Sequence, residues 1–479
     1  MCVHYVLIMY LYTIYGEKME FSEWYSEILE KAGIYDLRYP IKGCGVYLPY
    51  GFKIRRYSFE ILRKLLDDTN HDETLFPMLI PENLLAKEGE HIKGFEDEVY
   101  WVTHGGKSPL EIKLALRPTS ETTMYYMMKQ WIKVHTDLPM KLYQVVNTFR
   151  YETKHTRPLI RLREIMSFKE AHTAHSTQDD CNKQIKEAIE IYGKFFDEIC
   201  IPVIISKRPE WDKFPGADYT MAFDTIFPDG KTMQIGTVHN LGQNFAKTFE
   251  LEFETPDGNK DYAYQTCYGI SDRAIASLIA IHGDEKGLVI PIDVAPIQIV
   301  LIPLLFKGKE EIVIEKIKEL SKILKTKYRV HVDDRDIRPG RKYNDWEIKG
   351  VPLRIEIGPR DIEEGKAVIV RRDNGQKMTV EAFNILNEVE KTFEDYKASL
   401  LQKATEKLEK YITVIENDKK DLLLLSEKVK FALSESKGII LVPYIESIYN
   451  EEFEGLIDAS VLGLTTYNGK EYISIARTY

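Results

Sequence analysis

Residues 148–175 read TFRYETKHTRPLIRLREIMSFKEAHTAH, and this stretch decides the fold of the chain. The apolar run at 142–146 predicts a buried strand, and the run at 165–171 predicts a second one. A polar loop between them carries five positive charges, at Arg150, Lys154, Arg157, Arg161 and Arg163. Two strands that flank such a loop can hold a polyphosphate, because a guanidinium group binds two phosphate oxygens at once.

One carboxylate stands inside this cationic loop. Glu152 follows Arg150 by two positions, so on a strand both side chains would point the same way. A carboxylate there can accept a hydrogen bond from an amino group such as that of adenine. The alternative is a solvated charged hairpin, which is what most charge runs are.

The composition limits the kinds of protein to which this chain can belong. A chain of 479 residues, 44% apolar and 29% charged, suggests two or three globular domains with ample core. The net charge of −10 excludes a general basic field, so any nucleic-acid contact must use local patches. The five cysteines form no CxxC pair, which indicates a reducing compartment and disfavours a disulfide framework or a cysteine-built zinc site.

The first 18 residues contain the apolar run VHYVLIMYLYTIY, at residues 3–15. It is shorter than the roughly 20 residues of a spanning helix, and it lacks a basic region and a small-residue cleavage site. We expect translation to begin at Met19, or this leader to pack as an additional strand. A cytoplasmic protein without a membrane anchor is predicted.

Three further segments carry candidate ligands. In RPTSE, at 117–121, Thr119 and Glu121 can accept from a ligand's ammonium, although Thr119 or Ser120 could simply cap the helix predicted at 122–134. Arg273 lies in the first turn of a helix, where a cation is unfavourable unless an anion waits there; the alternative is an ordinary surface arginine. The strand at 232–245 carries Gln234, Thr237 and His239, which is typical of a site floor or of a solvated edge.

The organisation of the chain changes along its length. A strand is predicted at 73–81, where Pro77 suits a sheet edge or an interface. From residue 297, strands alternate with helices, which predicts an α/β domain of about 100 residues. Residues 403–437 are expected to be charged helix, and the tail at 439–479 a strand, a helix and a hairpin that turns at Asn468 and Gly469.

Several segments occur in an order typical of one family: GVYLPYGFKIRR with ETLFPMLIP, RPTSE, FRYE followed by RPLIRLRE, MQIGTVHNLGQNF, and GISDRAIASLIAIHGD. Together they resemble the class II aminoacyl-tRNA synthetases, and more narrowly the prolyl-tRNA synthetases of archaeal and eukaryotic type. RPGRKYNDWEIKGVPLRIEIGPRD resembles the start of the anticodon-binding domain of that family. The resemblance covers residues 19–479.

The resemblance implies a three-part architecture. It predicts an α+β catalytic domain with an antiparallel sheet at 19–288, an α/β anticodon-binding domain at 295–397 and a small α+β C-terminal domain at 403–479. Many relatives bind zinc through four cysteines in that last domain; this chain has none after Cys267, so we expect it to fold without zinc. Glu170 and Cys267 are 97 positions apart, too few for the bacterial editing domain, so no cis editing is expected.

The resemblance also implies the reaction, its partners and its residues. Proline and ATP would give prolyl-adenylate and pyrophosphate, and the prolyl group would pass to the terminal ribose of tRNA(Pro). A homodimer would form through the first of the segments quoted above, called motif 1. Arg150 and Arg273 would be the catalytic residues. The ATP site would comprise Arg150, Glu152, Arg161, Leu162, Gln234, Thr237, Ser271 and Arg273, with Mg²⁺ accompanying ATP near Gln234. The proline pocket would comprise Thr119, Glu121, Arg150, Phe168, Glu170, His172 and His239.

Within these sets the resemblance assigns roles. Arg150 would bridge the proline carboxylate and the α-phosphate, and Glu152 would hold the adenine amino group. Arg161 and Arg273 would bind the triphosphate. Proline has a secondary ammonium with two N–H donors, which Thr119 and Glu121 could both accept. Relatives often end in tyrosine with the last carboxylate toward the active site, and Tyr479 here could lie likewise or be a frayed end.

Other readings stay open from the sequence alone. Another class II synthetase, for threonine or histidine, would share most motifs, but RPTSE and the Glu-Ala-His segment at 170–172 argue against it. A non-catalytic paralogue that binds RNA or a partner would usually have lost the motif arginines. A metal site at His172 and His175 is disfavoured, because no cysteine lies at zinc-finger spacing.

Overall fold

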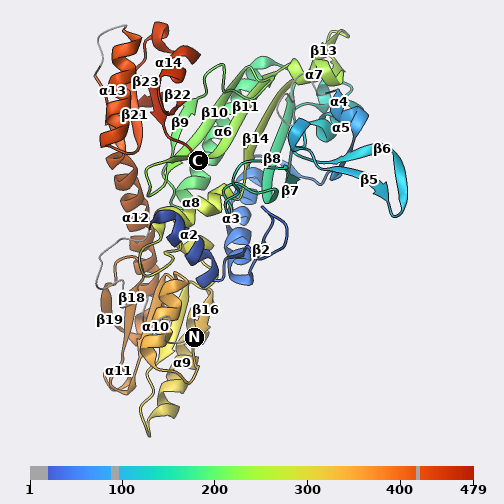
Figure 1. Cartoon of the computed structure of the whole chain (residues 1–479). Helices are drawn as coiled ribbons and strands as arrows, with labels where there is room; N and C mark the ends of the chain where they lie inside the picture. The colour runs from blue at the N-terminus through green and yellow to red at the C-terminus, as the bar shows by residue number, and fades with distance from the viewer. Residues whose placement is uncertain (1–19, 88–95, 417–420) are drawn as a thin grey trace.

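The computed structural model describes residues 20–87, 96–416 and 421–479. The predictions for the leader and for a start at Met19 lie outside these residues. Figure 1 shows an upper body built on one large sheet, a smaller lower body, and a long helix that joins them along one side. No helix in the described ranges has the length and apolar character needed to cross a membrane.

The large sheet has eleven strands in the order β20-β21-β23-β22-β9-β10-β11-β14-β8-β7-β3. Its centre is antiparallel, as predicted, and runs from β9 to β7. The strands predicted around 142–146 and 165–171 are longer than expected. The central strands are β7 (Met140–Phe149), β8 (Glu164–His175), β9 (Ile204–Lys207), β10 (Tyr219–Ile226), β11 (Thr232–Gly242) and β14 (Tyr264–Ile270).

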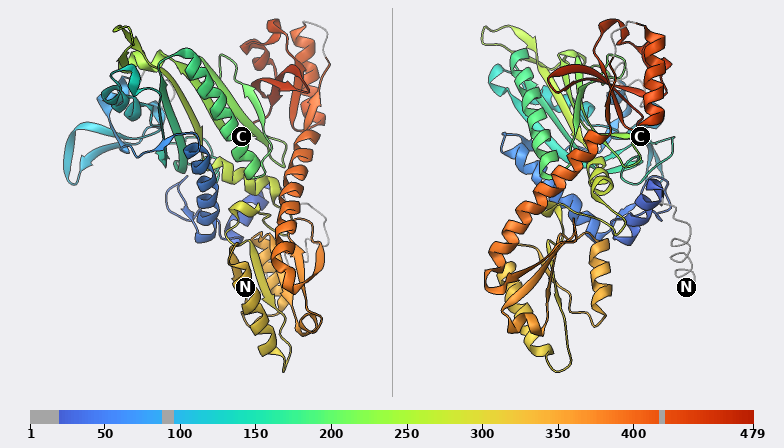
Figure 2. Two further views of the ribbon diagram at one scale, coloured as in Figure 1. Left: turned by 180° about the vertical axis from the view of Figure 1, so that it is seen from behind. Right: turned by 90° about the vertical axis from the view of Figure 1, so that its left-hand side faces the viewer.

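Helices cover one face of this sheet. The longest of them, α6 (Gln178–Glu198), begins at Thr177, whose side chain accepts from the backbone N–H of Asp180. Its apolar positions recur every three or four residues, so Tyr192, Phe195 and Phe196 all face the sheet and are buried there. Figure 2 shows α6 lying along the sheet. The same core is completed by α2 (Phe21–Lys31), α3 (Pro49–Asp67) and α8 (Arg273–His282).

The strand predicted at 73–81 is wrong as one element. The chain forms β3 (Asp72–Glu73) at the edge of the large sheet, and then β4 (Leu79–Pro81) in a three-stranded sheet of order β4-β6-β5. Pro77 lies between them, and because it has no N–H it cannot continue a ladder of hydrogen bonds.

The hairpin of β5 (Trp101–Gly105) and β6 (Ser108–Leu116) projects from the body in Figure 1. Two smaller sheets pair β1 (Tyr35–Asp36) with β2 (Val46–Tyr47) and β12 (Glu252–Glu254) with β13 (Lys260–Tyr262).

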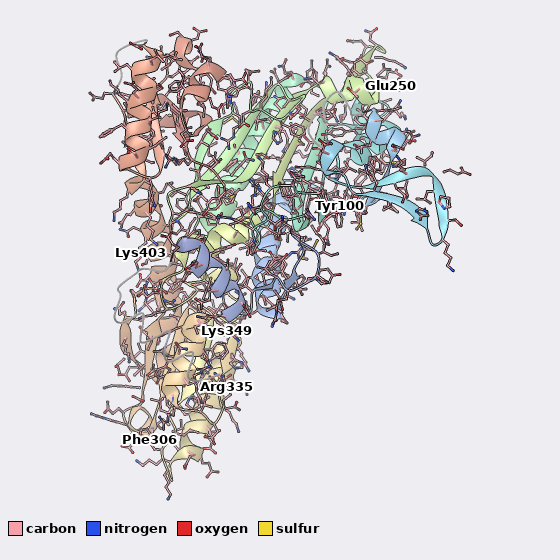
Figure 3. The ribbon with its side chains drawn as sticks, viewed as in Figure 1. Tyr100, Glu250, Phe306, Arg335, Lys349 and Lys403 are labelled. Atoms are coloured by element: carbon pink, nitrogen blue, oxygen red, sulfur yellow. The ribbon has the colours of Figure 1, made fainter. Side chains whose placement is uncertain are left out.

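The lower body is the predicted α/β domain. Its five strands have the order β16-β15-β17-β18-β19, with parallel pairing around β15 and antiparallel pairing beyond β17. At its junction with α3, Tyr50 donates to the carbonyl of Lys349 at 3.1 Å, and Figure 3 shows Lys349 at that boundary. Its elements are β15 (Ile299–Pro303), α9 (Glu310–Leu324), β16 (Val330–Val332), α10 (Pro339–Ile348), β17 (Leu353–Ile357), α11 (Pro359–Glu363), β18 (Lys366–Arg371) and β19 (Lys377–Glu381).

The C-terminal part differs from the expected helix at 403–437. One continuous helix, α12 (Ile385–Lys410), spans the predicted boundary between 397 and 403, and β20 (Ile412–Val414) follows it. The short β-branched segment of β20 pairs with β21 (Ile439–Pro443), and this pairing outweighs the helix propensity of its neighbours. The remaining elements are α13 (Leu422–Glu435), α14 (Glu451–Leu456), β22 (Ser460–Tyr467) and β23 (Lys470–Ala476).

The predicted hairpin is present and has an unexpected partner. Asn468 and Gly469 have φ values of 48° and 75°, as a tight turn between β22 and β23 requires. Leu464 of β22 pairs with Lys207 of β9, so the C-terminal strands extend the large sheet. The end of the chain returns to the large sheet as well, where Thr478 bridges Thr232.

Candidate active site

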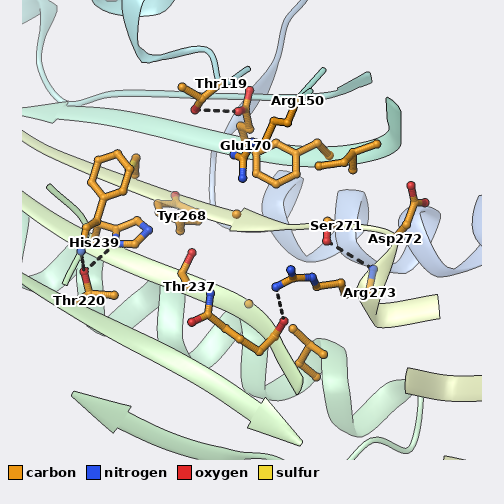
Figure 4. Close-up of a pocket in the computed structure, with 18 of the residues that line it drawn as sticks. Thr119, Arg150, Glu170, Thr220, Thr237, His239, Tyr268, Ser271, Asp272 and Arg273 are labelled. Carbon is orange, nitrogen blue, oxygen red and sulfur yellow. Dashed lines mark hydrogen bonds between the residues drawn. The ribbon is translucent and has the colours of Figure 1, made fainter. Parts of the chain in front are cut away.

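One cavity of about 530 Å³ opens on the face of the large sheet opposite α6, and every residue predicted for the site lines it. Side chains reach it from β8, β11 and β14, from the loop after β7, and from the N-terminal ends of α5 (Glu121–Trp131) and α8. Figure 4 shows Thr119, Arg150 and Glu170 along one side, His239 and Thr220 at one end, and Ser271 and Arg273 at the other. The sheet thus brings together segments that are far apart in the sequence.

Three arginines converge in this cavity. Arg150 follows β7 and donates from Nε to the carbonyl of Pro118 at 3.2 Å. Arg273 donates from Nε to the carbonyl of Ile160 at 3.0 Å, and from its terminal nitrogen to the carbonyl of Gln234 at 3.3 Å. Burial, together with the positive charges of Arg150 and Arg161, lowers the pKa of Arg273 to about 10. The cations repel one another, so a polyanion between them would be stabilised.

Two other arginines of the cationic loop stack on aromatic rings. Arg163 lies over the ring of Tyr151 at 4.0 Å, and Arg157 lies over the ring of Tyr479 at 4.9 Å. Because β7 ends at Phe149, Arg150 and Glu152 lie in the loop, as predicted, and the shared side-chain direction of residues on one strand does not apply to them. Both nevertheless line the cavity, and the carboxylate of Glu152 lies 3.7 Å from Nε of Arg161.

Two buried carboxylates lie at the opposite end from Arg273. The hydroxyl of Thr119 donates to Glu121 and also to Oε1 of Glu170 at 3.3 Å. Burial, and then the negative charge of Glu121, raise the pKa of Glu170 to about 7. Ser120 precedes α5 without capping it, because its hydroxyl instead accepts from Nε2 of Gln144 at 2.8 Å. This end of the cavity is therefore suited to a cation.

Two histidines border the carboxylates. Nδ1 of His172 lies 2.9 Å from the hydroxyl of Tyr125, and Nδ1 of His239 lies 2.8 Å from the hydroxyl of Thr220. Burial lowers the pKa of His172 to about 4 and that of His239 to about 3. Both rings are uncharged at neutral pH, so they form a pocket wall with the ring of Phe168.

Arg208 also lines the cavity, although no motif in the sequence pointed to it. This buried side chain donates to Oε1 of Gln234 at 2.7 Å and to Oδ1 of Asp224 at 3.0 Å. Since arginine can only donate, the oxygen of Gln234 is engaged, and its amide NH₂ group is left for a ligand. The NH₂ group of Gln234 can donate to a phosphate, and its oxygen keeps one further lone pair. Nothing in the run KRP at 207–209 signalled this contact.

Tyr479 is held beside the site. Its backbone N–H donates to the carbonyl of Thr232 at 3.1 Å, and its hydroxyl donates to Asp229 at 2.6 Å. Its ring packs on Phe227 with centroids 5.1 Å apart and lies under Arg157. The last residue is thus ordered against the loop that carries Arg161, although within the described chain it is not one of the lining residues.

Models of three protein domains match successive parts of the chain. Residues 100–282 match the tRNA synthetase class II core domain (G, H, P, S and T). Residues 298–392 match an anticodon binding domain, and residues 412–479 match the C-terminal domain of prolyl-tRNA synthetase.

Individual relatives are similar over nearly their full length. The proline--tRNA ligase of Methanococcus maripaludis (strain C7) is 83% identical over 461 residues, which is 96% of this chain and all of the relative. That of Methanocaldococcus jannaschii is 70% identical over the same shares. Among solved structures, Giardia lamblia prolyl-tRNA synthetase in complex with prolyl-adenylate has a TM-score of 0.91 and 34% identity, covering 96% of this chain and 98% of that one. The Cryptosporidium parvum enzyme complexed with halofuginone and AMPPNP has a TM-score of 0.88 and 33% identity, over the same shares.

An antiparallel sheet whose face carries three converging arginines, followed by an anticodon-binding domain, defines a class II aminoacyl-tRNA synthetase. Within this class, the relatives and the match of the C-terminal domain point to one family. The chain belongs to the family of proline--tRNA ligases.

Proposed function

We propose that both steps of proline ligation take place in this cavity. In the first, L-proline and ATP give prolyl-adenylate and pyrophosphate; in the second, the prolyl group passes to the terminal ribose of tRNA(Pro) and AMP leaves. The observation that carries this assignment is the arrangement of charge, with a carboxylate pair at one end and three guanidinium groups beside it. The prolyl-adenylate in the Giardia lamblia relative supports it.

The first step needs no nucleophilic side chain. The proline carboxylate attacks the α-phosphate and pyrophosphate leaves, so the enzyme contributes positioning and charge stabilisation. Arg150 is well placed for this role, because it lies close enough to Glu170, Glu121 and Glu152 to interact with their charges. From there its guanidinium can bridge the proline carboxylate and the α-phosphate while negative charge develops on the phosphate.

The carboxylate pair would bind the amino acid. The two N–H donors of the proline ammonium would be accepted by Thr119 and Glu121. The pyrrolidine ring would lie against Phe168 and the uncharged rings of His172 and His239. Glu170 would lie behind Thr119, where it adds negative charge when it is ionised.

ATP would occupy the other end of the cavity. Glu152 would accept from the adenine amino group, and Arg161 and Arg273 would bind the phosphates. The remaining contacts to ATP would come from Gln234, Thr237, Leu162 and Ser271. Mg²⁺ would neutralise phosphate charge and keep most of its waters, with no protein ligand assigned.

Proline-dependent exchange of pyrophosphate into ATP tests this function directly. We expect exchange with proline and none with threonine or histidine at equal concentration, followed by charging of tRNA(Pro). Exchange with another amino acid in preference to proline would identify a different class II synthetase. Exchange with none would identify a non-catalytic paralogue.

Arg208 is expected to position Gln234 for ATP. Replacing it by glutamine removes a charge-assisted hydrogen bond, so KM for ATP should rise about tenfold with little change in kcat. The measurement is pyrophosphate exchange as a function of ATP concentration. The exposed Arg56→Gln serves as the control variant.

The same substitution leaves Asp224 buried without its partner, which could destabilise the protein. The double variant Arg208→Gln/Asp224→Asn removes both charges. It should show the same raised KM for ATP as Arg208→Gln, with thermal stability restored. A KM for ATP equal to that of the wild type in this double variant would contradict the role of Arg208.

Selectivity against small amino acids is expected to be incomplete. The wall of Phe168, His172 and His239 can reject larger side chains, but missing methylene groups lower binding only about 10–200-fold. We therefore expect measurable pyrophosphate exchange with alanine and with cysteine. Exchange below detection for both would show that another feature of the pocket rejects them.

We further propose a homodimer formed through motif 1. Leu75, Met78 and Leu79 are 79%, 41% and 42% exposed, and such a cluster of apolar side chains marks an interaction surface. Leu75→Glu should shift the sedimentation mass from two chains to one. Leu423→Glu changes another exposed leucine, on α13, and should leave the dimer intact. A monomeric wild-type protein would rule out the dimer.

The tRNA would reach both bodies. The acceptor end would enter the cavity, and the anticodon would bind the lower domain by base stacking and hydrogen bonds to base edges. A cytoplasmic location fits this reaction and the reducing environment indicated by the cysteines.

A further inference from the structure

Three potential metal ligands meet at the proline end of the cavity. One ligand atom each from Glu121, His172 and Cys267 lies within 4.8 Å of the other two. All three residues are buried, with exposures of 4%, 1% and 4%, and all three line the cavity. The site is therefore shielded from bulk water but open to a small ion.

The fold rather than the local sequence brings them together. In the register of β8 and β14, His172 pairs directly with Cys267, and Glu121 reaches the same point from the first turn of α5. His175, which is three residues from His172, contacts Thr173 and Asp180 instead. The donor set is thus one imidazole, one thiol and one carboxylate.

This set matches the chemistry of zinc. Zn²⁺ binds sulfur, nitrogen and oxygen at about 2.0–2.3 Å, and three protein ligands leave a fourth position for water or a ligand. Tetrahedral ligands at these distances are about 3.3–3.8 Å apart, so shifts of the side chains of about an ångström would close the site. Softer ions such as Cd²⁺ share this preference for a thiolate.

The surroundings already orient two of the ligands. The hydroxyl of Tyr125 lies 2.9 Å from Nδ1 of His172, an arrangement in which Nε2 carries the lone pair when Nδ1 donates. The hydroxyl of Thr119 donates to the carboxylate of Glu121. Partners of this kind are typical of metal-ligating histidines and carboxylates.

We propose that Glu121, His172 and Cys267 bind a thiophilic divalent cation of the Zn²⁺ type when no amino acid is bound, and that this ion excludes proline. Binding forms a metal–sulfur bond, and the proton of the Cys267 thiol leaves to solvent; nothing is oxidised or reduced. The exclusion rests on the proposed function, because Glu121 would serve either the ion or the proline ammonium. This inference departs from the sequence-based expectation that protein side chains form no zinc site.

Cobalt provides the direct test, because a Co²⁺–thiolate bond gives a charge-transfer absorption band. The full chain, freed of metal and without substrates, is titrated with Co²⁺. We expect the band to saturate at one equivalent in the wild type and in Cys44→Ala, whose thiol lies outside the cavity. Cys267→Ala should lose the band, and His172→Gln should weaken binding at least tenfold. Thermal unfolding of each variant shows whether it is folded.

Competition tests the exclusion. Proline at ten times its KM should raise the apparent dissociation constant for Co²⁺ about tenfold, and Zn²⁺ should inhibit exchange competitively with proline. The absence of a thiolate band in the wild type, or its persistence in folded Cys267→Ala, would overturn the site. A band that proline does not weaken would overturn the exclusion. A normal band without proline-dependent exchange would leave the metal site standing and reject the proposed function instead.

Discussion

Arg150→Ala is expected to abolish proline-dependent pyrophosphate exchange, with a loss of kcat/KM of about a thousandfold or more. Arg150 interacts with the charges of both Glu170 and Glu121 and with that of Arg273, so in the proposed binding mode its guanidinium contacts both substrates as they react. Removing a preorganised donor from such a site lowers kcat about 10²–10³-fold, and loss of binding to the proline carboxylate adds to this. The measurement is steady-state exchange at varied proline and ATP.

Arg163→Ala is the matched control. Arg163 belongs to the same loop, but its guanidinium stacks on Tyr151 and donates to the carbonyl of Glu152, outside the cavity. Its replacement should lower kcat/KM for pyrophosphate exchange less than tenfold. If folded Arg150→Ala retained more than a tenth of wild-type kcat/KM, the assignment of Arg150 to the reaction would be wrong.

Proline activation should weaken about tenfold at pH 6 and about a hundredfold at pH 5, relative to pH 8. Burial and the charge of Glu121 raise the pKa of Glu170 to about 7, so its charge is present above pH 7 and is lost as the pH falls. A cationic ammonium is bound best by the ionised pair, so kcat/KM for proline should fall by one power of ten per pH unit below 7. His172 and His239, with pKa values near 4 and 3, stay uncharged in this range.

Glu170→Gln separates this effect from general acid inactivation. The variant should be weak at pH 8, should resemble the wild type at low pH, and should lose the pH dependence between 8 and 5. KM for ATP should change little across this range in both proteins. A wild-type profile that is flat from pH 8 to pH 5 would show that Glu170 does not contribute its charge to proline binding.

Much of the fold follows from local pattern. The helices predicted at 122–134 and around Arg273 are present as α5 and α8, although α8 is buried all round after Arg273 and not on one face only. The turn pair at Asn468 and Gly469 predicts its hairpin, because both residues adopt positive φ readily. The errors are at 73–81 and 403–437, where pairing with distant strands decides the outcome. Local propensity carries no information about such partners.

The sequence by itself predicted most of the charged and polar residues that line the cavity, because they stand in recognisable local segments. Only the tertiary structure decided how they meet. Antiparallel register placed Cys267 opposite His172, and the loop after β9 placed Arg208 on Gln234. Burial among those neighbours, rather than residue type, set the shifted pKa values of Glu170 and Arg273. Register, burial and the repulsion between charges depend on distances through space, which the order of residues along the chain does not specify.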